Sequence, residues 1–209
     1  MLSLAQNFLF IHVQKAGGNS IQSALLPYSE DYQENLPHTE KSQDFEVKNS
    51  QFPSLRKHSS LRDYQQLLSE ETFQRLYKFA CVRNPWERMM SFYFSPHRLG
   101  EEWSRDNFIK LMEIVPSAIS MLITKDETGL KTVQMKPEVD FIIRFENLEK
   151  DFAHVCGEIG IPKINLPHKN QRTRKNYLNY YDDDLSQLIE KKFADDIEAF
   201  GYLNPLISS

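Results

Sequence analysis

The stretch VQKAGGNS, residues 13–20, joins a predicted strand to a predicted helix and carries residue types that bind anions. Gly17 and Gly18 have no Cβ, so backbone N–H groups can turn toward one point. The N-terminus of the following helix adds positive potential, and Lys15 adds a full charge. An ordinary tight turn with a surface lysine would use the same residues. Taken alone, the stretch is therefore a weak indication of a cradle for phosphate or sulfate.

Two polar residues, Asn19 and Ser20, follow the glycine pair. Each can cap the helix or donate a hydrogen bond to an oxyanion. Lys15 precedes the glycines, whereas in the GxxxxGK[ST] nucleotide loop the lysine follows them. This order argues against ATP or GTP as the ligand.

A second stretch, VRNPWERMMS at residues 82–91, repeats the arrangement of a strand followed at once by a helix. Asn84 is typical of a helix N-cap, and the proline after it suits the first helical position. Arg83 stands just before this start, and Asn84, Arg88 and Ser91 share a helix face by their spacing. The planar guanidinium group suits a phosphate dianion. A capped helix with exposed charges is the alternative, but two such turns in one sheet favour a shared anion site.

The elements that position these turns alternate between strand and helix. Apolar runs predict strands at Phe8–Val13, Lys78–Val82 and Val139–Phe145. Helical spacing of apolar residues predicts helices at Ser20–Leu26, 61–68, a short one capped by Ser69, one directly after Val82, Trp103–Val115, Asn147–Ile159 and Asp183–Ala199. Residues 29–57 are predicted to be a long irregular stretch, and residues 116–137 are ambiguous. The pattern indicates an α/β fold with a short, mostly parallel sheet, whose ligands bind beyond the carboxyl ends of the strands.

Length and composition limit the classes of function. The 209 residues suit one domain spanning the whole chain, and the net charge of −4 argues weakly against general nucleic-acid binding. Cys81 and Cys156 are expected to be buried reduced thiols, with a disulfide open only in an oxidising compartment. No metal-ligand cluster, signal peptide or apolar run of roughly 20 residues is evident. We expect a cytoplasmic protein with no integral membrane segment if Met1 is the natural start.

The two turns together resemble a known family. HVQKAGGNS resembles the 5′-phosphosulfate loop of sulfotransferases that use 3′-phosphoadenosine 5′-phosphosulfate (PAPS), and VRNPWERMMSFY resembles their 3′-phosphate-binding strand and helix. The similarity is to the carbohydrate branch, close to the heparan-sulfate 2-O and 6-O enzymes and their small bacterial relatives. KHSSLRDYQQLL, VDFIIRFENLEKDFAHVCGEIGI and the C-terminal PHKNQRTRKNYLNYYDDDL and FADDIEAFGY agree with it, so the resemblance covers most of the chain.

The resemblance implies a P-loop-like sulfotransferase fold, PAPS as donor, a carbohydrate or glycoconjugate acceptor and no metal. It also implies donor-binding residues. The 5′-phosphosulfate would be held by Lys15, Ala16, Gly17, Gly18, Asn19 and Ser20, and the 3′-phosphate by Arg83 and Ser91. Two positions depart from the family pattern, because Gln14 stands where proline is common and Asn19 where threonine is usual. A backbone cradle should survive both changes.

Transfer of a sulfuryl group to an alcohol needs a base for the hydroxyl proton and a cation near the leaving oxygen. Lys15 is the expected cation. His58, at the end of the long polar stretch and just before a helix, is the expected base, and the resemblance supports it. The alternative for His58 is a surface or capping histidine. His12 is the second candidate for the base, although it also fits a buried histidine that supports the loop; the other histidines carry no comparable argument.

The basic stretch HKNQRTRKNY, residues 168–177, is either a solvated loop or a flap over the nucleotide. The resemblance favours cofactor contacts there, from Arg174 and Lys175. Two other functions stay open at this stage. One is a nucleotide kinase-like phosphotransferase. Against it, the sequence has no lysine at the position expected in such an enzyme and no evident carboxylate for Mg²⁺. The other is a degenerate sulfotransferase-like domain that binds a nucleotide or partner. A glycolipid, a capsule polysaccharide, a small glycan and a peptide tyrosine all remain as acceptors.

Overall fold

The computed structural model describes residues 1–34, 46–95, 102–125, 135–166 and 177–207. Its centre is a four-stranded sheet with the order β1-β2-β5-β6. The strands are β1 (Leu2–Ser3), β2 (Phe8–Ile11), β5 (Tyr77–Val82) and β6 (Phe141–Arg144). β1 is antiparallel to β2, while β2, β5 and β6 run parallel to one another. The fold is therefore mixed α/β with a mostly parallel sheet, as the sequence predicts.

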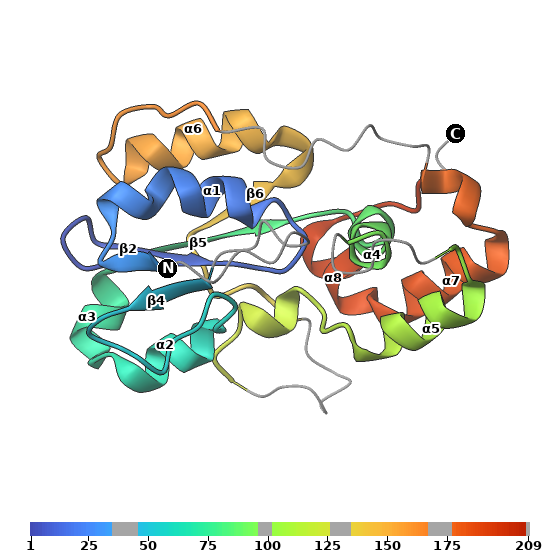
Figure 1. The fold of residues 1–209 in the computed structure, drawn as a ribbon, viewed down its shortest axis with the longest axis horizontal. Helices are drawn as coiled ribbons and strands as arrows, with labels where there is room; N and C mark the ends of the chain where they lie inside the picture. Colours follow the sequence, from blue (N-terminus) through green and yellow to red (C-terminus); the bar gives the residue numbers. More distant parts are fainter. Residues whose placement is uncertain (35–45, 96–101, 126–134, 167–176, 208–209) are drawn as a thin grey trace.

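Helices cover both faces of this sheet (Figure 1). α1 (Gly18–Leu25) and α6 (Leu148–Glu158) lie on one face, and α2 (Leu61–Leu67) and α3 (Glu70–Arg75) lie on the other. Because both faces are covered, the strands are apolar along their length, and all of β2 is buried. The predicted cap of α3 is confirmed, since the Ser69 hydroxyl accepts from the Thr72 N–H at 3.2 Å.

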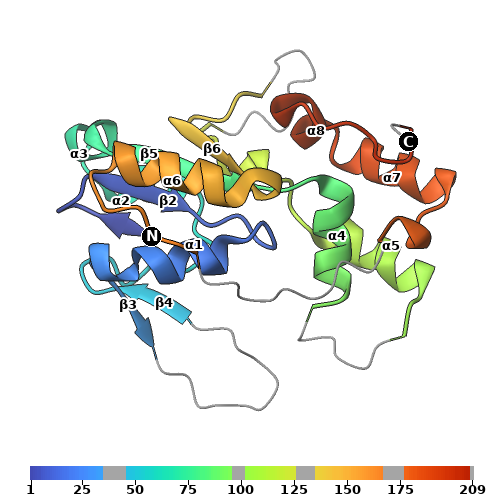
Figure 2. The ribbon, with the colours of Figure 1, turned by 90° about the horizontal axis from the view of Figure 1, so that it is seen from above.

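A second group of helices lies beyond the carboxyl ends of the parallel strands (Figure 2). It consists of α4 (Pro85–Tyr93), α5 (Arg105–Ile114), α7 (Asp183–Lys192) and α8 (Ala194–Phe200). α4, α5 and α7 share their own hydrophobic cluster, which includes Trp86, Phe108, Leu185, Ile189 and Phe193, and Ile197 of α8 packs against it. The Trp86 indole N–H donates to the Ser186 hydroxyl at 2.8 Å, so α4 and α7 are joined by a buried hydrogen bond.

The described residues also include four short 3₁₀ helices. They are η1 (Leu26–Tyr28), η3 (Ile119–Met121), η4 (Phe145–Asn147) and η5 (Tyr177–Tyr180). η1 begins at Leu26, where the sequence predicts the first helix to end, and it contains Pro27. η3 lies in the segment whose structure the sequence leaves ambiguous.

Two predicted elements differ from the structure. The stretch 29–57 is not wholly irregular, because β3 (Asp31–Glu34) and β4 (Glu46–Asn49) pair as antiparallel strands. Both strands are short and mostly polar, and they lack the alternation of apolar and polar residues that indicates a strand. A 2.7 Å hydrogen bond from the Asn49 side chain to the Asp31 carboxylate helps to hold the pair together.

The predicted C-terminal helix is also two helices. α7 ends and α8 begins at Phe193, whose backbone leaves helical geometry while its ring stays buried. The break lets α8 turn so that Asp196 accepts hydrogen bonds from the backbone of Ala118 and Ile119, each at 2.8 Å.

Candidate functional site

The loop between β2 and α1 has two residues in the left-handed backbone region. Gly17 has φ 87°, which glycine adopts without strain, and Lys15 has φ 62°, which is uncommon for a residue with a side chain. Such conformations persist where the surroundings hold them, and they concentrate at functional sites. The Lys15 ammonium group donates to the Ser95 hydroxyl, just after α4, at 3.3 Å. The loop therefore points its lysine toward the helical group rather than away from the molecule.

Close packing requires glycine at both positions of the pair. A Cβ on Gly17 would lie 2.7 Å from Cδ2 of Phe145, and a Cβ on Gly18 would lie 2.2 Å from Cδ2 of His12. Beneath the loop, the Cys81 thiol donates to the Ala16 carbonyl at 2.7 Å. Burial raises the pKa of Cys81 well above its ordinary value, so the thiol stays protonated and keeps this bond.

The second predicted turn meets the first. Nη1 of Arg83 donates to the Lys15 carbonyl at 3.4 Å, and Nη2 lies 3.1 Å from the Glu87 carboxylate. The guanidinium carbon lies 4.0 Å from the ring centroid of Phe145. Nε of Arg83 is buried and has no hydrogen-bond partner among the described residues. The two turns come together because β2 and β5 are neighbouring parallel strands that end at the same edge of the sheet.

The start of α4 follows the sequence prediction. Oδ1 of Asn84 accepts from the N–H groups of Trp86 and Glu87 at 3.0 and 3.4 Å, which makes Asn84 the N-cap. Ser91 lies further along α4 and is half-buried. Ser95, which the sequence does not single out, contacts Lys15 from just beyond the helix.

Arg88 differs from both sequence interpretations, because it neither faces the anion site nor lies in solvent. Its side chain is 1% exposed and donates through Nε to the Gln14 carbonyl at 3.0 Å and through Nη2 to the Pro116 carbonyl at 3.1 Å. Nη1 lies 3.6 Å from the buried Asp196 carboxylate. Burial lowers the pKa of Arg88 and raises that of Asp196, and their mutual attraction opposes both shifts. Arg88 thus supports the loop through its hydrogen bond to the Gln14 carbonyl.

Two histidines lie next to the loop in a defined arrangement. Nδ1 of His58 is 2.9 Å from the His12 carbonyl oxygen, and the two rings pack edge to face with centroids 4.6 Å apart. A carbonyl can only accept, so Nδ1 of His58 carries the proton and Nε2 of the neutral ring carries the lone pair. When the ring is neutral, His58 therefore has the tautomer that a proton acceptor at Nε2 requires.

His12 itself is buried beneath Gly18. Its Nδ1 lies 3.1 Å from Oε1 of Gln22, which again places the proton on Nδ1. Burial lowers the pKa of His12 well below 6.5, and the nearby His58 and Lys57 lower it further. A neutral buried ring that packs against Gly18 fits the supporting role, which the sequence left as the alternative for this residue.

Comparison with known proteins decides the class of this site. Residues 2–113, more than half of the chain, match the family model described as "Sulfotransferase family". The chain belongs to the sulfotransferase family. It is thus a transferase that moves a sulfuryl group. No curated protein and no solved structure matches the chain.

The part of this sulfotransferase that matches the family includes both turns and His58, but it ends before Phe145. Strand order could have pointed to Phe145, since it directly follows β6, the next parallel strand. Arg174 and Lys175 lie outside the described residues. Arg144, the last residue of β6, donates to the Phe200 carbonyl and packs over the Tyr202 ring at 5.1 Å, so its side chain contacts the C-terminal part of the chain.

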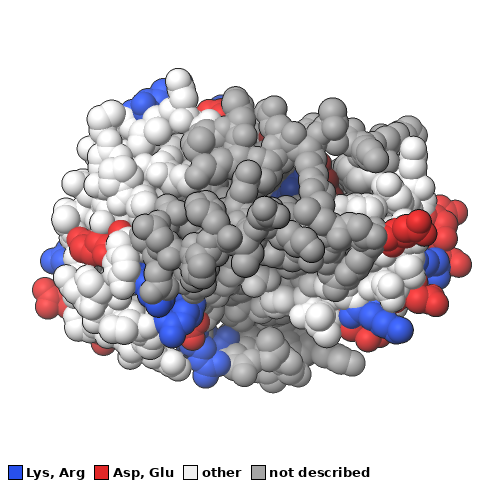
Figure 3. Space-filling model, viewed as in Figure 1, with Lys and Arg blue, Asp and Glu red and all other residues white. Residues whose placement is uncertain are grey.

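The remaining expectations from the sequence concern the cysteines, metal ligands and membrane-spanning segments. Cys81 and Cys156 are both buried free thiols. Within the described ranges, no cluster of three or more His, Cys, Asp or Glu side chains could hold a metal. No helix in the described part of the chain is long and apolar enough to cross a membrane. On the face shown in Figure 3, described basic side chains lie in small groups near acidic ones.

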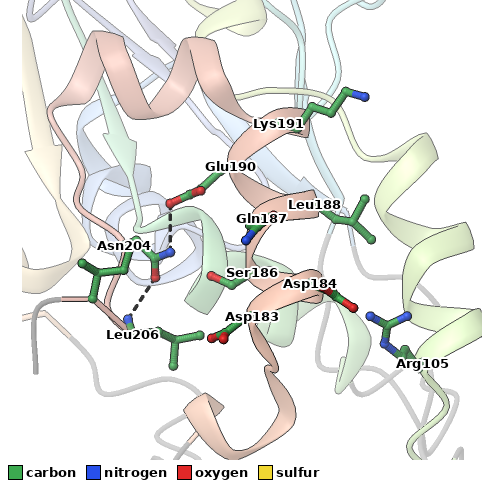
Figure 4. A pocket seen from close by; sticks show the side chains of 11 residues that line it. Arg105, Asp183, Asp184, Ser186, Gln187, Leu188, Glu190, Lys191, Asn204 and Leu206 are labelled. Carbon is green, nitrogen blue, oxygen red and sulfur yellow. Dashed lines mark hydrogen bonds between the residues drawn. The ribbon is translucent and has the colours of Figure 1, made fainter.

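A surface hollow lies over α7 and the C-terminal residues (Figure 4). Its lining includes Arg105, Asp184, Glu190, Asn204 and Leu206. Asn204 donates to Glu190 at 2.8 Å, and its own side-chain oxygen accepts from the Leu206 N–H at 2.9 Å. The first of these hydrogen bonds joins the C-terminal segment to α7, and the second lies within that segment. None of the residues that are both described and predicted for chemistry lines the hollow.

Proposed function

We propose that this sulfotransferase transfers the sulfuryl group of PAPS to a hydroxyl of a carbohydrate or glycoconjugate. The observation that carries the proposal is the contact between the two turns, where Nη1 of Arg83 lies 3.4 Å from the Lys15 carbonyl. A single nucleotide with phosphates at both ends of its ribose could touch both turns. The family membership supports the transfer itself, and the paired turns support the doubly phosphorylated donor.

The residues of the two turns fit such a donor. The α1 N-terminus, the glycine pair and the Lys15 ammonium group suit the phosphosulfate, with Ala16, Asn19 and Ser20 offering backbone or side-chain donors. Arg83 suits the 3′-phosphate because its buried Nε has no hydrogen-bond partner among the described residues, and Ser91 would add a hydroxyl. We extend the proposal to Arg174 and Lys175 as further donor contacts.

The proposed reaction is an in-line displacement at sulfur. Nε2 of His58 takes the proton of the acceptor hydroxyl as the new bond between the acceptor oxygen and sulfur forms. The bond between sulfur and the bridging oxygen breaks, and its electron pair leaves on the 5′-phosphate of adenosine 3′,5′-bisphosphate. Lys15 stabilises the charge that develops on that oxygen.

The carbohydrate acceptor rests on the similarity of HVQKAGGNS and KHSSLRDYQQLL to the carbohydrate branch. The position of His58 supports this choice. Its Nδ1–H donates to the carbonyl of His12, and His12 in turn packs beneath the loop, so the base is held next to the donor site. A screen of glycans with radiolabelled PAPS would identify the acceptor by the labelled product.

Donor identity is tested by titration calorimetry with adenosine 3′,5′-bisphosphate, AMP and ATP with Mg²⁺. We expect the bisphosphate to bind more tightly than AMP, because only the bisphosphate engages Arg83. Preferential binding of ATP with Mg²⁺ would refute the proposed donor and favour a phosphotransferase. Tight binding of the bisphosphate without transfer to any glycan would favour a domain that binds and does not catalyse.

Two substitutions separate binding from proton transfer. Lys15→Ala and His58→Ala should each remove most of the transfer activity, with His58→Ala lowering kcat by roughly 10²–10⁴-fold. Only Lys15→Ala should weaken the affinity for adenosine 3′,5′-bisphosphate, since His58 acts on the acceptor. His154→Ala, at a half-exposed position on α6, is the matched histidine control and should retain transfer. Unchanged bisphosphate affinity in Lys15→Ala would contradict the assignment of the loop.

A further inference from the structure

Phe145, the first residue after β6, lies between the two turns and contacts both. Its ring fills the space that a Cβ on Gly17 would need, with Cδ2 only 2.7 Å from that position. The Arg83 guanidinium carbon lies 4.0 Å from the centroid of the same ring. One aromatic side chain thus supports the glycine loop and the arginine, although it lies outside both sequence motifs and outside the residues that match the family.

The ring also limits how Arg83 can be oriented. Nη1 and Nη2 are held by the Lys15 carbonyl and the Glu87 carboxylate, while the ring lies against the guanidinium carbon. A guanidinium over an aromatic face is attracted by the ring quadrupole, and the attraction grows as water is excluded. The Arg83 side chain is only 14% exposed, so this contact is largely shielded from water.

Glu146, the residue after Phe145, adds a second contact between the end of β6 and the second turn. Oε1 of Glu146 accepts a hydrogen bond from the Asn84 N–H at 2.9 Å, and Asn84 is the N-cap of α4. The end of β6 therefore contacts Arg83 through Phe145 and the neighbouring cap through Glu146. Displacing Phe145 would shift the arginine relative to the loop while leaving the loop's own residues intact.

We propose that Phe145 is a positioning residue that sets the preference of this site for a 3′-phosphorylated nucleotide by holding Arg83 against the glycine loop. The inference rests on the proposed donor. Phe145 acts through Arg83, so its loss should affect the 3′-phosphate more than the 5′-phosphate.

The test measures dissociation constants for adenosine 3′,5′-bisphosphate and AMP, and takes their ratio as the preference. Phe145→Met keeps most of the side-chain volume and removes the ring, so it should fold. We expect its preference for the bisphosphate to fall by about tenfold, the size of a shielded cation–π contact. Phe145→Tyr keeps the ring and should keep the preference. Phe145→Leu is a second ring-free variant with the same expected result.

The matched control is Phe141→Leu, on the same strand, where the ring packs against His154 at a centroid distance of 4.6 Å. This control should retain the wild-type preference. In a double-mutant cycle, Phe145→Met should cause little further loss of preference when Arg83 is already alanine, because the two residues act as one unit.

Three outcomes would overturn the inference. Phe145→Met and Phe145→Leu could keep the wild-type preference, or Phe141→Leu could lower it equally, or the losses from Phe145→Met and Arg83→Ala could simply add. Each of these leaves the proposed donor standing, provided that the wild-type protein prefers the bisphosphate. A wild-type protein without that preference would overturn the proposed donor, and the inference about Phe145 with it.

Discussion

At the scale of single residues, the packing of the His12 ring depends on the absence of a Cβ at Gly18. The imidazole occupies the space that any Cβ at position 18 would need, and the ring is in turn held by Gln22 and covered by the loop. A protonated His12 would place a charge in this buried space. The chain therefore keeps the ring neutral, and the pKa of His12 lies well below 6.5.

This neutral histidine predicts a pH dependence of stability. Between its lowered pKa in the folded protein and pH 6.5, His12 binds a proton in the unfolded chain but not in the folded one, so the free energy of unfolding falls as the pH decreases through this window. The contribution is at most about 1.4 kcal/mol per pH unit and vanishes above pH 6.5. Urea unfolding at pH 7.5, 6.5 and 5.5 measures it.

The decisive comparison is with His12→Asn, which should show a smaller loss of stability between pH 6.5 and 5.5. His154→Gln, at a half-exposed position, should lose as much stability as the wild-type protein over the same interval. An equal pH dependence in wild type and His12→Asn would show that His12 is not the group responsible.

At the scale of elements, the buried pair Arg88–Asp196 joins α4 to α8. Arg88 also donates to the Gln14 carbonyl in the loop, and Asp196 accepts from the Ala118 and Ile119 N–H groups. The pair thereby links the loop, two helices and the segment after α5. Both side chains are at most 2% exposed, so neither charge can be satisfied by water if its partner is removed.

We expect Asp196→Asn to lower the free energy of unfolding by about 3–5 kcal/mol, because it leaves the Arg88 charge buried without its partner. The control is Arg105→Ala, which removes the exposed pair Arg105–Asp182 and should cost less than about 1 kcal/mol. Urea unfolding of both variants at pH 7.5 provides the comparison. Equal, small losses would mean that the buried pair does not hold the elements together.

At the scale of the whole molecule, the site lies between two hydrophobic clusters. One cluster surrounds the sheet, and the other joins α4, α5, α7 and the residues near α8. Apolar residues of the glycine loop and α1 belong to the first cluster, whereas those of α4 belong to the second. Figure 2 shows α4 on the side of α5 and α7. A nucleotide that touches both turns would therefore bridge the two parts.

Binding of this kind should stabilise the whole chain. At a concentration of 100 Kd, adenosine 3′,5′-bisphosphate should add about 2.7 kcal/mol to the free energy of unfolding and raise Tm by roughly 5–11 °C. Hydrogen exchange should slow at the first turns of both α1 and α4. Protection of only one of these turns would contradict a single ligand that contacts both.

The sequence predicts the features that depend on neighbouring residues. The apolar run at β2, the glycine pair and the caps at Ser69 and Asn84 are local patterns, and the structure has each of them. The sequence does not predict the pairing of β3 with β4 or the break at Phe193. The pairing joins two polar strands that lack an alternation of apolar and polar residues. The break at Phe193 depends on contacts between α8 and residues far away in the sequence, such as the hydrogen bond between Asp196 and Ala118.

Local patterns are enough to predict the mixed α/β class, the two turns and the residue types that they carry, because strand and helix periodicity and backbone capping involve neighbouring residues. How those residues are used depends on contacts that exist only in the folded chain. The tertiary structure buries Arg88 with Asp196, gives His58 the His12 carbonyl as its partner, and places Phe145 between Gly17 and Arg83. These contacts join residues far apart in the chain, and packing density and burial of charge select them only once the sheet has formed.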